Sequence, residues 1–276
     1  MKRNTSVREH FKLNTDTRGK ERKMKALEGR VAVITGAGKG IGRATALEMG
    51  QAGLKLVLAG VRDNSIEAVK EELKGVTEDV ITVRTDVSQW KDAERMAQRA
   101  LEKFGRIDIL VNNAAIHPSK KDGFRFNILE IEDSDWDLVL NTNLKGMFNC
   151  AKAVLPAMIE QRSGRIVNLG STTALTGNFS PIHYVASKGG IMSMTKAMAR
   201  ELGQYKIAVN CVTPGLTITP MHNDTPQELI DRAASMISLG RAGMPEDIAR
   251  VICCLASDDI FMTGQTVVVD GGSTMH

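Results

Sequence analysis

The chain has 276 residues, of which 42% are hydrophobic and 25% charged, an ordinary composition for a globular protein built as one large domain. No apolar run approaches the ~18 residues of a membrane-spanning helix, so we expect no contact with a membrane. The formal net charge is +4, but residues 1–30 alone hold ten Lys/Arg and four Asp/Glu, so the basic excess belongs to the N-terminal segment.

We interpret residues 1–26 as a basic, disordered extension, because they carry charge without apolar periodicity. A nucleic-acid-binding arm is the alternative. The segment lacks the interleaved aromatic residues that stack on bases, however, and we expect no nucleic-acid partner. Met24 lies just before the first apolar strand and is an alternative start of translation. Residues 27–276 then form the folded domain.

The cysteines and histidines predict neither a metal site nor a disulfide framework. The four cysteines lie in apolar stretches without the spacing of metal ligands, and the five histidines are scattered along the chain. We therefore expect no bound metal and a reducing compartment, the cytoplasm.

Short apolar strands alternate with helical patterns along the folded domain. The predicted strands are 31–34, 55–59, 80–84, 107–111, 165–169, 207–212 and 265–269. The first three predicted helices are 43–49, then 64–73 with Asn64 as its cap, and then a helix that is capped by Ser88 and ends at Phe104. A long helix is predicted from Ser134 past Asn143, with a bend near Pro156, and the next helix carries Tyr184 and Lys188. The last two predicted helices are 227–238 and a helix that begins at Pro245. This alternation predicts an α/β fold, a doubly wound, Rossmann-type parallel sheet with helices on both faces, in a single domain.

The turn after the first strand is rich in glycine. Gly36, Gly40 and Gly42 follow the spacing G-x-x-x-G-x-G, and a helix begins directly after them. Glycine lets the backbone approach a bulky anion, and a helix N-terminus offers unpaired N–H groups and a positive dipole end. We therefore interpret this turn as the binding site for a cofactor pyrophosphate. On this motif alone, a plain strand-to-helix connection stays an alternative.

Three residues in the second half of the chain form a reactive combination. Ser171 follows the 165–169 strand, Tyr184 stands near the start of the next helix, and Lys188 lies one helical turn further on. Together with the glycine-rich turn upstream, they make the sequence resemble the short-chain dehydrogenase/reductase family from about Leu27 to Gly272. Residues 239–249 resemble the branch that contains 3-oxoacyl-carrier-protein reductases and sugar or cyclic-alcohol dehydrogenases.

The resemblance implies a set of catalytic and cofactor-binding residues. The catalytic tetrad is Asn143, Ser171, Tyr184 and Lys188. The implied cofactor contacts are Thr35, Gly36, Gly38, Lys39, Gly40, Ile41 and Gly42 in the glycine-rich turn, Arg62 after the second strand, Asp86 and Val87 near the adenine, Asn113 and Ala114 after the fourth strand, Pro214, Gly215, Thr217 and Thr219 over the nicotinamide, and Tyr184 and Lys188 from the tetrad. Two departures from the family pattern are Ala115, where glycine is usual, and a loop from His117 to Phe126 that is longer than in the simplest members.

The tetrad also makes chemical sense for the reduction of a ketone. A ketone that accepts hydride develops negative charge on its oxygen, so a proton donor and a second hydrogen-bond donor must stand beside that oxygen. Tyr184 would donate the proton and Ser171 would hold the oxygen. Because a free tyrosine has a pKa near 10, we expect the positive charge of Lys188 to lower the pKa of Tyr184 toward ~7. By resemblance, Lys188 also binds the cofactor ribose, and Asn143 holds a water that links Lys188 to solvent.

The residues after the second strand bear on the choice of cofactor. An NAD site needs an acid there to bond the ribose hydroxyls, but Gly60 occupies this position. Lys39 in the turn and Arg62 beyond the strand favour the added phosphate of NADP. Asp63 leaves NAD open, since a small shift of the loop would bring its carboxylate to the ribose.

The sequence thus predicts an NAD(P)-dependent oxidoreductase that transfers hydride between the nicotinamide and a small-molecule ketone or secondary alcohol, with Tyr184 as general acid/base. A 3-oxoacyl-carrier-protein reductase is the specific alternative, while a non-catalytic cofactor-sensing protein and a lyase or epimerase are the other classes. By resemblance we expect a homotetramer. The segment from Thr217 to Ser238 would form a lid over a substrate that the sequence does not identify.

Overall fold

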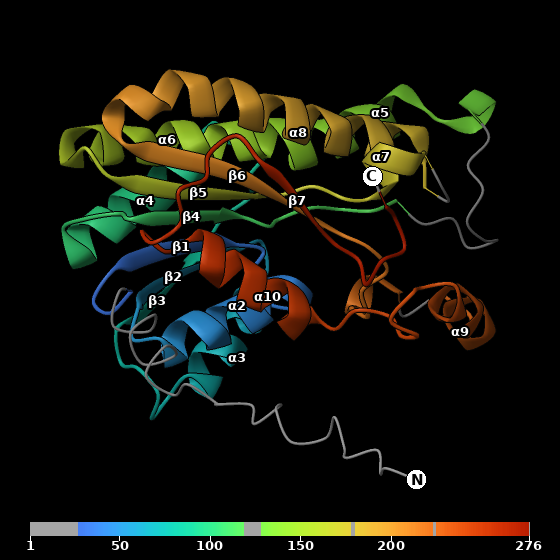
Figure 1. Cartoon of the computed structure of the whole chain (residues 1–276). Helices are drawn as coiled ribbons and strands as arrows, with labels where there is room; N and C mark the ends of the chain where they lie inside the picture. The colour runs from blue at the N-terminus through green and yellow to red at the C-terminus, as the bar shows by residue number, and fades with distance from the viewer. Residues whose placement is uncertain (1–26, 119–127, 178–179, 223–224, 276) are drawn as a thin grey trace, which may run out of the picture.

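The computed structural model describes residues 27–118, 128–177, 180–222 and 225–275. Within these ranges, seven parallel strands form one sheet in the order β3-β2-β1-β4-β5-β6-β7 (Figure 1). The strands are β1 (Val31–Thr35), β2 (Lys55–Gly60), β3 (Val80–Arg84), β4 (Ile109–Asn112), β5 (Gly164–Leu169), β6 (Ile207–Pro214) and β7 (Thr266–Val269). All seven predicted strands are present, with ends that shift by at most two residues.

Helices cover the sheet on both sides (Figure 1). One layer consists of α2 (Gly40–Gln51), α3 (Asp63–Glu72) and α10 (Pro245–Leu255), and the other of α4 (Trp90–Phe104), α6 (Gly146–Gln161) and α8 (Ile182–Leu202). The shorter helices are α5 (Asp133–Leu140), α7 (Thr173–Thr176) and α9 (Gln227–Ser235). The predicted doubly wound, Rossmann-type fold is therefore confirmed.

Strand β1 shows why the strands appear in the sequence as continuous apolar runs. Val31 and Val33 pack into the core beneath α4, α6 and α8. Ala32 and Ile34 pack into the core beneath α2, α3 and α10. Because helices cover both faces of a parallel sheet, neither set of alternating side chains reaches water, and both must be apolar.

The predicted helix caps at Asn64, Ser88 and Ser134 are wrong by one or two residues. The N-cap positions of α3, α4 and α5 are Arg62, Gln89 and Glu132, and none of these side chains caps its helix. Ser88 instead bonds to the carboxylate of Asp86, two residues earlier. Packing against the sheet sets these helix starts, since it outweighs the ~1 kcal/mol of a typical cap.

The long helix expected from Ser134 is interrupted. A π-helical segment over Asn141–Lys145 separates α5 from α6. Pro156 lies inside α6, as expected. Helix α9, predicted over 227–238, ends at Ser235, three residues before the predicted end.

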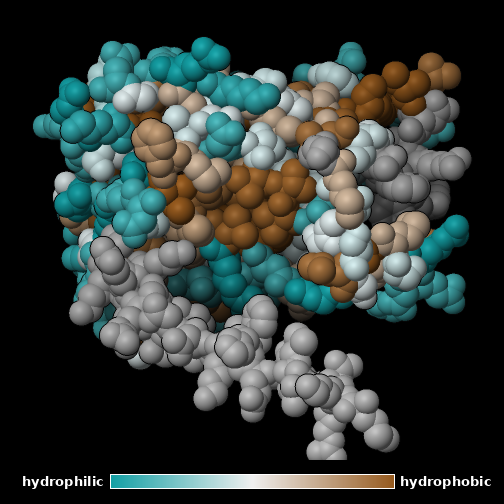
Figure 2. All heavy atoms as spheres, viewed as in Figure 1, coloured by the Kyte–Doolittle hydropathy of each residue, from teal (hydrophilic) through white to brown (hydrophobic). Residues whose placement is uncertain are grey.

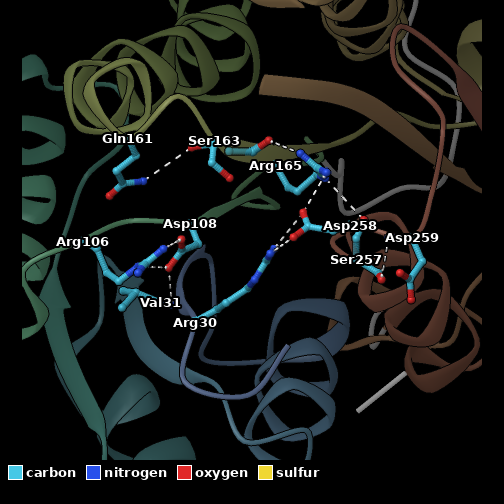
Figure 3. A network of polar contacts seen from close by, with 11 residues as sticks. Arg30, Val31, Arg106, Asp108, Gln161, Ser163, Arg165, Ser257, Asp258 and Asp259 are labelled. Atoms are coloured by element: carbon cyan, nitrogen blue, oxygen red, sulfur yellow. Dashed lines mark hydrogen bonds and ion pairs between the residues drawn. The ribbon is translucent and has the colours of Figure 1, made fainter. Parts of the chain in front are cut away.

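A polar network braces the edge of the sheet where the strands begin (Figure 3). Buried Asp108 accepts hydrogen bonds from the first N–H of β1 (2.9 Å) and from the guanidinium of Arg106 (2.8 and 2.6 Å). Arg30 and Arg165 both form ion pairs with Asp258, which follows α10. Each of these arginines pairs with an aspartate of the same group, so the network is structural. It lies at the edge opposite the carboxyl ends of the strands.

The residues that the structure describes were searched for a membrane-spanning helix and for a cluster of metal ligands. None of the helices described there is long and apolar enough to cross a membrane. The same residues include no group of three or more His, Cys, Asp and Glu side chains placed to hold a metal ion. The N-terminal extension 1–26 and most of the loop 117–126 lie outside the described residues.

Candidate active site

The strand order reverses between β1 and β4, and open α/β sheets bind ligands beyond the carboxyl ends of the strands at this point. Thr35 joins the two strand ends. Its hydroxyl donates to the Val111 carbonyl (3.3 Å) and accepts bonds from the N–H groups of Asn113 and Ala114 (both 3.0 Å). The Asn113 side chain donates back to the Thr35 carbonyl (2.9 Å). Three of the predicted cofactor residues thus shape the turn through their own contacts.

The glycines of the turn are required by close backbone contacts. A Cβ on Gly36 would lie 2.9 Å from the Cα of Ala114. A Cβ on Gly42 would lie 2.2 Å from the Gly36 carbonyl oxygen, and one on Gly38 would lie 2.3 Å from the Ser65 hydroxyl. Larger residues would therefore push the first turn of α2 away from the end of β1.

The N-terminus of α2 suits an anion. The helix begins at Gly40, Lys39 at the N-cap forms no hydrogen bond to it through its side chain, and the first turn holds no acidic residue. Half-buried Ile41 packs against the core and anchors this turn. Free N–H groups and the positive helix dipole then face the end of β1, as a dinucleotide pyrophosphate requires.

Three charged residues surround the far end of this turn. Lys39, Arg62 and Asp63 are all exposed. The Ser65 hydroxyl donates to the Arg62 carbonyl (2.9 Å) and also packs against Gly38, so the start of α3 lies directly beside the glycine-rich turn. Asp63 is the first residue of α3, where its carboxylate interacts favourably with the positive end of the helix dipole.

Asp86 and Val87 follow β3 and have structural contacts of their own. The Asp86 carboxylate accepts bonds from the N–H (3.0 Å) and hydroxyl (2.7 Å) of Ser88. Val87 is buried, and its carbonyl accepts a bond from Asn149 of α6 (3.0 Å). Both residues thus hold the β3–α4 connection at the carboxyl edge of the sheet, the edge at which an adenine is expected.

Tyr184 and Ser171 are brought together from two elements. Tyr184 stands in the first turn of α8 and is 8% exposed, while Ser171 follows β5. The Ser171 hydroxyl lies beside the Tyr184 phenol and favours its ionised form. Thr173 supports Ser171, since its hydroxyl and its N–H lie 2.9 and 3.3 Å from the Ser171 oxygen. A phenol and an aligned hydroxyl therefore face the same space.

The acidity of Tyr184 differs from our expectation. Burial raises the pKa of Tyr184 to about 12, and the hydrogen bond from Ser171 opposes this rise without cancelling it. Lys188 does not lower it toward 7 in the isolated chain. The Lys188 nitrogen lies over the Tyr184 ring, 5.6 Å from its centre.

Lys188 is buried at 3% exposure, and its ammonium donates to the Leu169 carbonyl at the end of β5 (2.8 Å). Burial lowers its pKa to about 8, while the nearby Cys211 thiol favours the charged form. At neutral pH the ammonium is thus mostly charged, but its pKa is near the working range. A charge placed beside Lys188 would shift this pKa.

Asn143 lies in the π-helical segment and is 1% exposed. Its amide oxygen accepts a bond from the Ile116 N–H (2.8 Å), and its nitrogen donates to the Ile116 carbonyl (3.0 Å) and to the Ser187 hydroxyl (3.1 Å). The side chain therefore ties the segment after β4 to α8. Interruptions of this kind in a helix often occur at functional sites.

The segment after β6 reaches across the turn. The Pro214 carbonyl accepts a bond from Thr172 N–H (3.1 Å), and the Thr217 hydroxyl donates to the Gly215 carbonyl (3.1 Å). A Cβ on Gly40 would lie only 3.3 Å from Thr219. This segment therefore covers the N-terminus of α2 in the isolated chain.

Comparisons with known proteins agree with this geometry. Residues 36–274 match the family model described as enoyl-(acyl carrier protein) reductase. A 3-oxoacyl-(acyl-carrier-protein) reductase FabG of Thermotoga maritima is 40% identical over 247 residues, which cover 89% of this chain and 98% of that protein. A 3-oxoacyl-(acyl-carrier-protein) reductase of Synechocystis sp. is 38% identical over 255 residues, which cover 91% of this chain and 100% of that protein.

A solved structure extends the match to three dimensions. It is described as a short-chain dehydrogenase/reductase, glucose/ribitol dehydrogenase, from Brucella melitensis, and it aligns with a TM-score of 0.83 at 38% identity over 90% of this chain and 98% of that one. The chain belongs to the short-chain dehydrogenase/reductase family. As a member, it is an NAD(P)-dependent oxidoreductase that transfers hydride between a nicotinamide cofactor and a small-molecule ketone or secondary alcohol.

Sequence reasoning did not assign a role to three residues of this dehydrogenase/reductase site: His117, Thr173 and Ser187. The His117 ring packs against Tyr184, and Thr173 and Ser187 bond to Ser171 and Asn143. Two features of the sequence pointed weakly to Thr173 and Ser187. Thr173 follows Ser171 by two residues, and Ser187 lies next to Lys188.

Proposed function

We propose that Tyr184 is the general acid/base of this enzyme, that Ser171 holds the substrate oxygen, and that Lys188 and Asn143 complete the site. The observation that carries the proposal is the meeting of Ser171, which follows β5, with the buried phenol of Tyr184 in the first turn of α8. The bound nicotinamide supplies or accepts the hydride. Tyr184 gives its proton to the ketone oxygen in reduction and takes it back in oxidation.

Lys188 has two tasks in this proposal. Its ammonium favours the phenolate form of Tyr184 in the cofactor-bound enzyme, whereas burial dominates the pKa of Tyr184 in the isolated chain, and it also binds the cofactor ribose. Because the amine bonds only the Leu169 carbonyl among the contacts in the isolated chain that the structure describes, it keeps donors for a ribose hydroxyl. Asn143 positions α8 through Ser187 and Ile116 and keeps the proton path to solvent in place.

The test is Tyr184→Phe, which removes the acid and keeps the ring. Turnover should fall by roughly 10² to 10⁴, as is typical for an acid–base group, while cofactor binding survives. Tyr205→Phe is the matched control, because Tyr205 lies at the far end of α8, in the short helix Gly203–Tyr205. Retention of a tenth of the normal turnover by a folded, cofactor-binding Tyr184→Phe protein would exclude Tyr184 as the acid.

The substrate itself has two candidate classes. The Thermotoga and Synechocystis relatives act, by name, on 3-oxoacyl groups bound to a carrier protein, and the Brucella structure is described as a glucose/ribitol dehydrogenase. We propose a free ketone or secondary alcohol as the general class and a 3-oxoacyl thioester as the specific alternative. Rates with 3-oxoacyl thioesters, sugar alcohols and simple ketones, each followed by cofactor absorbance, distinguish the two.

We further propose that the enzyme prefers NADP. Gly60 offers no carboxylate to the ribose, while the exposed cations Lys39 and Arg62 flank the glycine-rich turn. Positive charge suits the added phosphate of NADP. Specificity constants for both cofactors test this, and a tenfold preference for NAD would show that Asp63 decides the site instead. Arg62→Ala should weaken NADP binding and leave NAD binding unchanged.

A homotetramer is the assembly that we propose. β7 is the last strand in the sheet order of the described residues, and Phe261, just before it, is fully exposed at 107%. Figure 2 shows an apolar area at the centre of this face, in the region where Figure 1 places β7. A free apolar sheet edge favours a partner chain. Light scattering at micromolar concentration tests the assembly, and a monomer would refute it.

We also propose that the enzyme works in the cytoplasm. All four of its cysteines are unpaired in the structure, and Cys150 and Cys211 are buried. Unpaired buried thiols fit a reducing compartment. Cell fractionation followed by immunoblotting tests the location.

A further inference from the structure

The ring of His117 packs against Tyr184 from the side of the sheet where β4 ends. The two ring centres are 4.5 Å apart, and the ring planes meet at 64° in an edge-on arrangement. At this separation the rings are in direct contact, in a geometry that aromatic pairs favour. The reaction proposed above gives His117 no task.

His117 is itself held firmly. Asn143 bonds both the N–H and the carbonyl of Ile116, the residue before it, at 2.8 and 3.0 Å. The Nε2 atom of His117 lies 3.4 Å from the hydroxyl of Ser180, which precedes α8. The imidazole therefore bridges the segment after β4 and the approach to α8, across the Tyr184 ring.

Two other described side chains lie beside Tyr184. The Ser171 hydroxyl favours its ionised form, and the Lys188 ammonium lies 5.6 Å from the ring centre. Among the described residues, Lys188 and His117 are ionisable groups beside the ring, and Cys211 of β6 interacts with Lys188. Removal of His117 would leave the ring free to turn and would open the phenol to water.

We propose that His117 is a positioning residue of the active site, which keeps the Tyr184 ring buried with its hydroxyl on Ser171. The expected effect of His117 on turnover rests on the proposed role of Tyr184. The expected effect of His117 on the ionisation of Tyr184 does not depend on that role. The aromatic ring carries the effect, so an aromatic residue without an ionisable group should replace His117.

The chain offers a direct measurement, because it contains only two tyrosines, Tyr184 and Tyr205. In a Tyr205→Phe background, the near-ultraviolet absorbance of tyrosinate reports Tyr184 alone. His117→Ala and His117→Phe are made in this background and in the wild-type chain. Thermal melting shows whether each variant is folded, and cofactor titration shows whether the dinucleotide site is intact.

We expect the pKa of Tyr184 to fall in His117→Ala from about 12 toward the ~10 of a solvated phenol. We expect kcat to fall by roughly 3- to 10-fold, the range that an aromatic contact corresponds to, with cofactor affinity unchanged. His117→Phe should restore both values. An unchanged tyrosinate titration in a folded His117→Ala protein would overturn the inference, and so would a His117→Phe protein that behaves like His117→Ala. A shifted titration with unchanged turnover would keep the contact but refute the role of Tyr184 as the acid.

Discussion

Lys188→Met should make the stability of the cofactor-free protein less dependent on pH. Burial lowers the pKa of Lys188 from 10.5 to about 8, and a depression of this size corresponds to about 3 kcal/mol against the charged form. Below pH 8 both the folded and the unfolded chain carry the proton, so the folded state bears the full cost. Between pH 8 and 10.5 the unfolded chain binds more protons, and the stability of the wild type therefore rises with pH.

Methionine fills the space of the lysine stem without a charge, so the variant lacks this rise. Urea denaturation of both proteins at pH 7 and at pH 10, at one protein concentration, measures the difference. We expect the wild type to gain roughly 2 to 3 kcal/mol relative to Lys188→Met over this interval. Groups that do not interact with Lys188 titrate alike in both proteins and cancel, whereas Cys211, which does interact with it, is buried, and burial raises its pKa to about 11. A stability difference that is the same at both pH values would show that Lys188 is not desolvated as the structure indicates.

Three further predictions concern the turn, the serine and the N-terminus. Gly42→Ala should abolish cofactor binding, because its Cβ would lie 2.2 Å from the Gly36 carbonyl oxygen, while Gly203→Ala, which meets nothing within 4 Å, should bind normally in a cofactor titration. Ser171→Ala should lower kcat by roughly 10- to 10³-fold, as for the loss of one oxyanion donor, and normal turnover would refute its role. A chain that starts at Met24 should keep its melting temperature and its turnover, and a loss of more than a few degrees would show that the extension is structural.

The sequence pattern was sufficient for the fold because its signals are local. Runs such as Val31–Ile34 are apolar at every position, as strands covered on both faces must be, and helical patterns separate them. The positions of the glycine-rich turn, Ser171 and Tyr184 at strand ends and helix starts also followed from spacing, and Lys188 lies one helical turn after Tyr184.

Details that depend on distant contacts did not follow from the sequence. The side chains of Ser88 and Asn64 are capable caps, but packing of the helices against the sheet placed the helix starts elsewhere. The interruption at Asn143 arises because its side chain bonds Ile116, 27 residues earlier in the chain.

The chemistry of the site shows the same division. The sequence by itself determined which side chains stand at the carboxyl edge of the sheet, since each follows a strand or begins the next helix in a parallel α/β fold. Only the tertiary structure decided their acidities and their neighbours. Desolvation depends on what surrounds a group in space, so burial, and not the nearby lysine, sets the pKa of Tyr184 in the isolated chain, and the chain path after β4 brings His117 onto its ring.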